Sequence, residues 1–127
     1  MKVPKELMAA SATPIVLGVL SGGEDYGYSL MRRVTEASGA QLEWKEGMLY
    51  PLLHRLEQQG LVASRWGASP GGRRRKYYAI TAAGRGELET HVTQWRLVVQ
   101  TLDALLPASP ALPARWPEGS ALTAGGI

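Results

Sequence analysis

Glu46-Gly-Met-Leu-Tyr-Pro-Leu-Leu-His-Arg-Leu-Glu-Gln-Gln-Gly-Leu-Val62 is the stretch that decides the fold. Its leucines recur at spacings of three and four residues, which places one apolar stripe on a helix. The stripe consists of Leu49, Leu52, Leu53 and Leu56. Gly60 can take the left-handed conformation that commonly ends a helix. The stretch therefore predicts a short helix with a polar face, which carries Lys45, Tyr50, His54 and Arg55.

A basic hairpin is predicted directly after this helix. Residues 61–67 and 73–80 have the composition of strands, and Pro70, Gly71 and Gly72 are typical of a turn. Five basic residues and no acidic one lie between Arg65 and Lys76. A helix followed by a hairpin with a cationic tip is the element order of a winged helix-turn-helix, which binds DNA far more often than it catalyses a reaction.

Length and composition set the limits for the rest of the chain. The protein has 127 residues, enough for one domain with extensions and a modest core, and its net charge is only +3. There is no cysteine, which excludes disulfides and thiolate metal sites, and two separated histidines suggest neither a metal site nor a cofactor. No apolar run is long enough to span a membrane and no signal peptide is visible, so a soluble, cytoplasmic protein without a membrane partner is expected.

The segment before the central helix is predicted to contain two further helices. Residues 7–20 are apolar along most of their length. Pro14 either lies in the first turn of a new helix capped by Thr13 or bends a single helix, and we favour the single bent helix. Asp25 is expected to cap the next helix, residues 26–38. Residues 41–44 are expected to form a short strand against the hairpin.

A long helix is predicted after the hairpin, because Thr81 is a good N-cap and an apolar run with helical spacing follows it. At about 24 residues this helix would be roughly 36 Å long, which is too long to be buried on a domain of this size. Its apolar residues form a heptad seam: Leu88, Val92, Trp95, Val99, Leu102 and Leu106. We therefore expect a dimerisation arm that packs on a second copy, beside residues 7–20 of that copy. The alternative is that the helix folds back on its own core.

The predicted fold class is mostly α with a small β-hairpin. Residues 1–80 are predicted to form a winged helix-turn-helix DNA-binding domain with an N-terminal helix, and residues 81–106 the dimerisation helix. Residues 107–127 are rich in Pro and Ala, a composition that predicts a tail that is disordered or loosely docked.

Three motifs in this order resemble the PadR family of winged-helix transcriptional regulators, most closely its small single-domain members. They are Asp25-Tyr26-Gly27-Tyr28, Leu49 to Glu57 with Gly60 to Val62, and Gly71 to Thr81 with Gly84. The resemblance covers residues 3 to about 106. It implies a homodimeric repressor that places the helix from Glu46 in the major groove and uses the hairpin as a wing. Met48 departs from the family pattern, which usually has Thr there; the change removes a phosphate hydrogen bond or adds a thymine-methyl contact.

The residues predicted to bind DNA lie on the polar face of the central helix and on the wing. Four cations beside two glycines at the tip of a wing favour neutralisation of the phosphate backbone over an ordinary solvated turn. Tyr50 lies opposite the leucine stripe, which favours an exposed phosphate contact over a position at the edge of the core. The predicted set is Lys45, Glu46, Gly47, Met48, Tyr50, Pro51, His54, Arg55, Gly72, Arg73, Arg74, Arg75 and Lys76.

Trp95 is large for a heptad position, and its two copies would lie near the two-fold axis of a dimer. A plain packing aromatic is the simpler interpretation. However, a multidrug-binding member of the small PadR group carries a Trp at the matching place, where paired indoles bind planar aromatic molecules, so the resemblance implies a ligand site here. Val99 replaces that relative's acidic residue, which weakens the basis for a preference for cations. The predicted site consists of Leu7, Ala10, Pro14, Val92, Trp95 and Val99.

Together these features predict a homodimeric DNA-binding transcriptional repressor of a pseudo-palindromic operator, released by a planar aromatic small molecule. No catalytic triad or glycine-rich phosphate loop occurs at recognisable spacing, so an enzyme is not expected. The alternative is a winged-helix adaptor for protein–protein interactions whose basic wing is only a solvated loop. A salt titration of binding to promoter DNA separates the two, because an adaptor forms no sequence-preferring complex.

Overall fold

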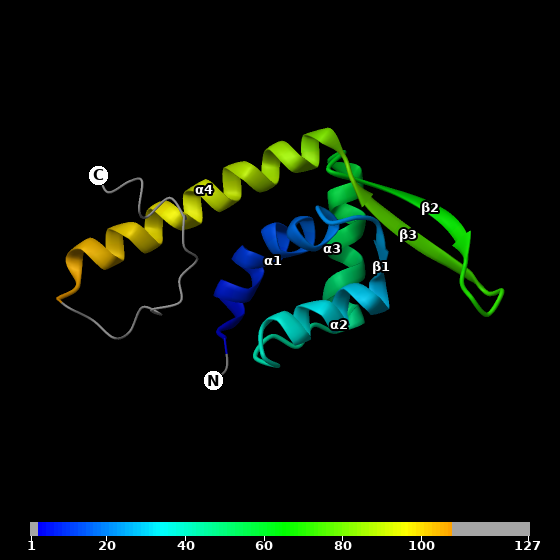
Figure 1. Ribbon diagram of the computed structural model, residues 1–127, viewed down its shortest axis with the longest axis horizontal. Coiled ribbons are helices and arrows are strands. Elements are labelled where there is room, and N and C mark those ends of the chain that lie inside the picture. The colour runs from blue at the N-terminus through cyan, green and yellow to red at the C-terminus, as the bar shows by residue number, and fades with distance from the viewer. Residues whose placement is uncertain (1–2, 108–127) are drawn as a thin grey trace. The chain divides into compact units, whose positions relative to one another are not determined.

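The computed structural model describes residues 3–107, in which helices predominate (Figure 1). The elements are α1 (Lys5–Leu20), β1 (Asp25–Tyr26), α2 (Gly27–Ala37), α3 (Glu46–Gln58), β2 (Val62–Ala68), β3 (Arg74–Ile80) and α4 (Ala82–Leu105). The chain divides into two compact units, Met1–Leu88 and Glu89–Ile127, with the boundary inside α4. The predicted fold class, a winged helix with a long final helix, is confirmed. The domain boundaries predicted at residues 80 and 106 stay predictions, and residues 108–127 of the predicted tail lie outside the described residues.

The core of the first unit is built from α1, α2 and α3. The largest fully buried side chains come from these three helices: Val16, Leu17, Leu20, Leu30, Leu49, Leu53 and Leu56. The predicted leucine stripe is thus the buried face of α3, because Leu52 is buried as well. Burial of this apolar stripe against α1 and α2 holds α3 in place and turns its polar face to solvent.

Both internal prolines are accommodated without breaking a helix. Pro14 lies inside α1, which is a single helix as favoured from the sequence, and Pro51 lies inside α3. Each proline removes one backbone hydrogen bond. The packed apolar faces of the two helices outweigh that local cost.

The sheet has three antiparallel strands in the order β1-β3-β2. β2 and β3 form the predicted hairpin, which projects away from the three helices in Figure 1. The third strand is β1, whose Asp25 and Tyr26 pair with Tyr78 and Tyr77. The prediction of a strand at residues 41–44 is therefore wrong. Trp44 instead packs into the core with only 6% of its surface exposed. The segment around it forms no strand, and burial of Trp44 fixes it against the core rather than at the edge of the sheet.

The junction between the hairpin and α4 is closely packed. The Thr81 hydroxyl accepts a hydrogen bond from the Gly84 N–H at 3.0 Å and donates one to the Gly60 carbonyl at 2.7 Å. Thr81 is thus the predicted N-cap of α4 and also links this helix to the end of α3. A Cβ atom on Gly84 would overlap the Leu61 carbonyl oxygen, so only glycine permits this close approach.

Candidate nucleic-acid interface

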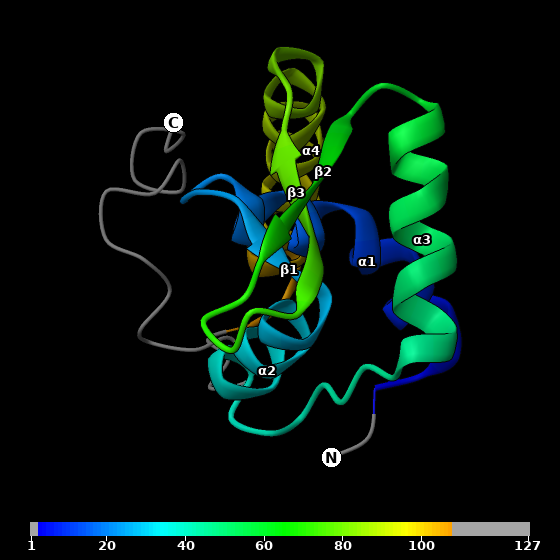
Figure 2. The same cartoon turned by 90° about the vertical axis from the view of Figure 1, so that its right-hand side faces the viewer.

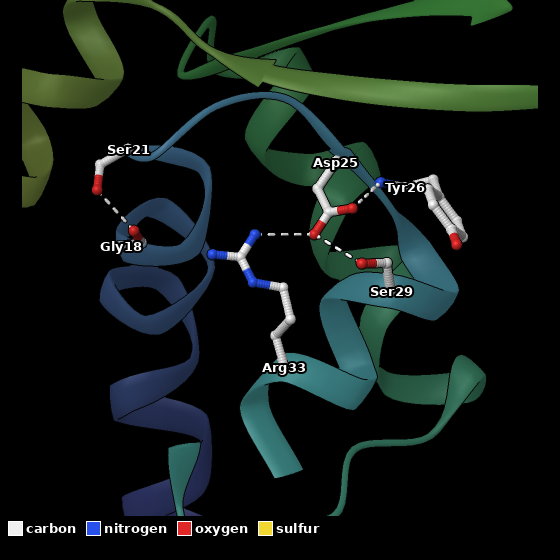
Figure 3. Close-up of polar contacts among 6 residues, drawn as sticks. All are labelled: Gly18, Ser21, Asp25, Tyr26, Ser29 and Arg33. Carbon is white, nitrogen blue, oxygen red and sulfur yellow. Dashed lines mark hydrogen bonds and ion pairs between the residues drawn. The ribbon is translucent and has the colours of Figure 1, made fainter. Parts of the chain in front are cut away.

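A buried carboxylate joins β1 to the start of α2 (Figure 3). Asp25 Oδ1 accepts a hydrogen bond from the Tyr26 N–H at 2.9 Å, and Oδ2 accepts one from the Ser29 hydroxyl at 3.1 Å. Arg33 reaches back from α2 to the same Oδ2 at 3.1 Å, as Figure 3 shows. Charge-assisted hydrogen bonds of this kind compensate a buried carboxylate for its lost hydration.

The predicted capping role of Asp25 is wrong in detail. Asp25 lies one residue before the N-cap position of α2 and belongs to β1. The N-cap residue is Tyr26, which makes no side-chain capping hydrogen bond. The same carboxylate nevertheless braces the first turns of α2 through Ser29 and Arg33. Since β1 pairs with β3, this cluster connects α2 to the wing.

The polar face of α3 is open to solvent, as predicted. Lys45, Glu46, Gly47, Tyr50, Pro51, His54 and Arg55 are exposed, and Met48 is half-buried. Glu46 lies in the first turn of α3 and Arg55 in the last, where both charges complement the helix dipole. The side chains that a DNA groove could meet are therefore displayed on one rigid helix.

Tyr50 is exposed and also packs against the first turn of α2, two positions that were alternatives in the interpretation of the sequence. A Cβ atom on Gly27 would overlap the Tyr50 hydroxyl and ring, so the ring lies directly against the start of α2. Partial burial, and then the charge of Glu46, raise the pKa of Tyr50 above its usual value. The phenol thus remains protonated at neutral pH and able to donate a hydrogen bond from an exposed helix face.

The wing carries its cations on alternating sides of β3, as the geometry of a strand requires. The Arg74 guanidinium lies 4.8 Å from the Trp66 ring centre, and Lys76 Nζ lies 5.8 Å from the same ring. Arg75 instead stacks over Tyr26 at 3.7 Å. The turn before them is closed by a hydrogen bond from the Gly72 N–H to the Ser69 carbonyl at 2.8 Å, with Gly72 at a φ of +84°. Contacts between cations and aromatic rings therefore arrange the wing before any ligand arrives.

An open groove of about 870 Å³ lies between α3 and the wing. Figure 2 shows α3 to one side of the strands of the wing, with α2 below these strands. The groove is lined by Tyr26, Gly27, Tyr28, Tyr50, His54, Trp66, Ser69, Arg73, Arg74, Arg75, Lys76 and Tyr78. A surface that combines cations, hydroxyl donors and aromatic rings is suited to nucleic acid.

This groove unites only part of the predicted DNA-binding set. It contains Tyr50, His54, Arg73, Arg74, Arg75 and Lys76. Met48, Pro51 and Arg55 line a smaller hollow of about 220 Å³ against α1, and Lys45 lines another hollow. Glu46, Gly47 and Gly72 are exposed but line none of these three hollows.

Sequence reasoning missed Tyr28 and Trp66 as members of this surface. Trp66 could have been found from strand alternation, because it lies directly opposite Lys76 in the hairpin register. Tyr28 belongs to the Asp25-Tyr26-Gly27-Tyr28 motif, but no local pattern indicated that it lies beside the wing.

The predicted ligand and dimer residues are distributed over α1 and α4. Leu7 and Ala10 are exposed on α1, and Pro14 is half-buried there. Val92, Trp95 and Val99 belong to the second unit of the chain. Leu102 and Leu106 are exposed. Whether these residues form a dimer seam with an aromatic ligand site stays a prediction.

Other kinds of site find no support in residues 3–107. No group of three or more His, Cys, Asp or Glu side chains there is placed to hold a metal ion. None of the helices in this part of the chain has the length and hydropathy needed to cross a membrane.

The fold and this surface define a winged helix-turn-helix protein. Residues 16–90 match the Transcriptional regulator PadR-like family, and the chain belongs to that family. The protein is therefore a DNA-binding transcriptional regulator and not an enzyme.

Two solved structures of similar proteins agree with this assignment, and a further relative is similar in sequence. A PadR-like transcriptional regulator from Bacillus cereus is 30% identical, with a TM-score of 0.72 over 83% of this chain and 100% of that one. A PadR family regulator from Eggerthella lenta is 32% identical, with a TM-score of 0.69 over 82% of this chain and 88% of that one. An uncharacterized protein of Lysinibacillus sphaericus is 26% identical over 104 residues, covering 82% of this chain and 95% of its own length. The family favours a regulator over the protein–protein adaptor considered from sequence.

Proposed function

We propose that the protein is a homodimeric transcriptional repressor that binds a pseudo-palindromic operator. In this proposal α3 enters the major groove and the wing neutralises the adjacent backbone. A planar aromatic molecule bound beside Trp95 releases the operator. The proposal rests on the resemblance to small PadR regulators and on the groove between α3 and the wing.

The groove is the observation that supports DNA contact by these two elements. It places the exposed Tyr50 and His54 of α3 opposite the cations of the wing. All four base pairs can be told apart by side chains on an element that fits the major groove, whereas phosphate neutralisation needs cations beside it. We therefore assign sequence preference to Tyr50 and His54 and non-specific affinity to Arg74 and Arg75. Lys45, which lies outside this groove at the start of α3, is assigned to sequence preference as well.

The apolar face of α4 supports the dimer. Leu102 has 47% of its surface exposed, and Val98, Leu105 and Leu106 on neighbouring turns are also exposed. A contiguous apolar face of this kind is typical of a protein interface. A second copy is the occupant we propose, because a two-fold pair presents two recognition helices about 34 Å apart, which suits two half-sites one DNA turn apart.

The proposed effector acts on the geometry of this dimer. Offset stacking against an indole contributes about 0.5–1.5 kcal/mol beyond burial, enough to favour flat aromatic compounds. Binding between the arms would favour one spacing of the recognition helices over another. A spacing that no longer matches the half-sites lowers affinity for the operator.

The test of operator binding uses the purified protein to retain fragments of genomic DNA, which are then sequenced. We expect a shared pseudo-palindromic sequence among retained fragments, and a reporter gene placed behind it should be repressed by the protein. Retention without any shared sequence would contradict specific recognition. Activation of the reporter would contradict repression and leave DNA binding intact.

The test of the effector compares the wild-type protein with Trp95→Ala, using the fluorescence of planar dyes. The signal of the dye is preferable to that of the protein, because Trp44 is buried in the core and its replacement would disturb folding. We expect Trp95→Ala to weaken dye binding and to keep operator binding. If the variant binds dye with full affinity and still releases DNA, the ligand site is not at Trp95.

A further inference from the structure

The groove between α3 and the wing exposes more aromatic surface than recognition of a DNA duplex requires. Tyr28 has 65% and Trp66 57% of its surface in solvent, and Tyr50 is exposed as well. All three line the same hollow as the four wing cations. A ligand with an aromatic face of its own could stack on these large rings and shield them from water.

A double helix offers little for such rings to contact. Its bases are stacked on one another, so a protein reaches only base edges, sugars and phosphates. Cations and hydrogen-bond donors serve those contacts, whereas no base of a duplex stacks on the exposed surface of the rings. An unstacked base, by contrast, presents a flat face together with a neighbouring phosphate, and it is bound by aromatic rings beside cations.

The sheet already arranges rings and cations in that combination. Trp66 lies opposite Lys76 in the register of the hairpin, and Tyr78 follows on the same side of β3. Lys76 Nζ is 5.8 Å from the Trp66 ring and 5.6 Å from the Tyr78 ring. The Arg74 guanidinium lies 4.8 Å from the Trp66 ring. One exposed indole thus has two positive charges within reach of any phosphate attached to a base that stacks on it.

We propose that this groove binds an unstacked nucleobase and its phosphate, with the base stacked on Trp66 and the phosphate neutralised by Arg74 and Lys76. The ligand has two possible sources, a single strand of nucleic acid or a free nucleotide, which share this chemistry. The inference goes beyond operator recognition, since it concerns base faces that a duplex hides. It would also allow an unpaired strand or a nucleotide to compete with the operator for the wing.

The experiment measures binding of the full chain to two labelled oligomers of equal length by fluorescence anisotropy. One is a single strand of thymidines, and the other is an abasic strand with the same phosphates and no bases. We expect the wild-type protein to bind the thymidine strand more tightly. Trp66→Leu should weaken that binding roughly tenfold, within the range that one stacked base contributes, and should leave the abasic strand unaffected.

Three variants separate stacking from charge. Trp66→Phe keeps a ring and should retain most of the preference for the thymidine strand. Arg74→Gln removes a phosphate contact and should weaken both oligomers alike. Arg32→Gln removes the same charge from an exposed position on α2 outside the groove and should change neither. Circular dichroism checks that each variant is folded.

Two results would overturn the proposal. One is equal affinity of the wild-type protein for both oligomers, and the other is an equal loss on both in Trp66→Leu. Competition by thymidine monophosphate, abolished in Trp66→Leu, identifies a free nucleotide as a sufficient ligand. Binding of the strand without such competition identifies the single strand. No duplex is used, so failure of operator recognition leaves this measurement standing.

Discussion

At the scale of single residues, the lack of a side chain at Gly27 determines where Tyr50 lies. We expect Gly27→Ala to destabilise the protein by about 1–3 kcal/mol, the usual cost of overpacking, because the added methyl group overlaps the Tyr50 ring. At an unobstructed helical position the same change is usually stabilising. Urea unfolding gives the free energy of unfolding.

The Tyr50→Ala background provides the control for this prediction. With the ring removed, Gly27→Ala should cost much less or become favourable. An equal cost in both backgrounds would mean that the methyl group meets something other than Tyr50.

Two phenols should make stability depend on high pH. Burial raises the pKa of Tyr78, with smaller contributions from Glu57 and Tyr50, and burial also raises the pKa of Tyr50. A pKa raised by folding means that the folded chain holds its protons longer than the unfolded chain. The contribution of these two phenols to stability is therefore fully present below a pH of about 10, the pKa of a free phenol. It is lost as the pH rises above that value.

Urea unfolding across this alkaline range measures that fall. Tyr78→Phe, which cannot ionise at this position, should reduce the dependence. A fall of the same size in Tyr78→Phe would assign the effect to other groups.

At the scale of elements, the start of α4 offers a matched pair of glycines. A Cβ atom at Gly84 would overlap the Leu61 carbonyl oxygen, whereas one at Gly86 would meet no atom within 4 Å. We expect Gly84→Ala to destabilise the protein by about 1–3 kcal/mol. Gly86→Ala on the same helix should stabilise it by roughly 0.5–1 kcal/mol. Thermal unfolding should show a lower midpoint temperature for Gly84→Ala and a higher one for Gly86→Ala than for the wild-type protein. Shifts in the same direction would show that α4 does not pack closely at Gly84.

The positive charge of the wing should make DNA affinity depend on the salt concentration. Neutralising Arg74 and Arg75 with Gln should weaken binding to every duplex. It should also lower the log–log salt slope by roughly 0.9 for each phosphate that the wing no longer neutralises. Substitutions at Lys45, Tyr50 or His54 should instead change the preference among sequences.

The measurement is a series of binding isotherms at increasing salt, with Arg32→Gln as a control that lies outside the groove. An unchanged slope after neutralising both arginines would remove the wing from the DNA interface.

At the scale of the whole molecule, the apolar face of α4 should decide the oligomeric state. Leu102→Asp places a charge in the predicted seam, and burying an unpaired charge is strongly unfavourable, so the dimer should dissociate. Leu97 lies outside the seam and has 62% of its surface exposed, which makes Leu97→Asp a matched control on the same helix. Analytical ultracentrifugation should find a monomer for the first variant and a dimer for the second. A dimer of normal stability in Leu102→Asp would show that the seam is wrongly assigned.

The features that could be predicted from the sequence depend on residues close together along the chain. The spacing of the leucines in α3 indicated its buried face, and Thr81 indicated the start of α4. The cationic hairpin followed from its turn residues and the run of arginines. Helical periodicity, capping and turns act over a few neighbouring residues, so these patterns sufficed for the fold class and for the two elements that form the candidate interface.

Only the tertiary structure decided which distant segments meet. Asp25 and Tyr26 form the third strand because the packing of α1 and α2 brings their backbone to the free edge of β3, while Trp44 is drawn into the core. The same packing sets Tyr28 and Trp66 beside the cations in one groove. Partners in a sheet or a groove are determined by burial of the whole core and not by the local pattern at either partner. Periodicity, capping and turn residues in a single sequence reveal only the local pattern.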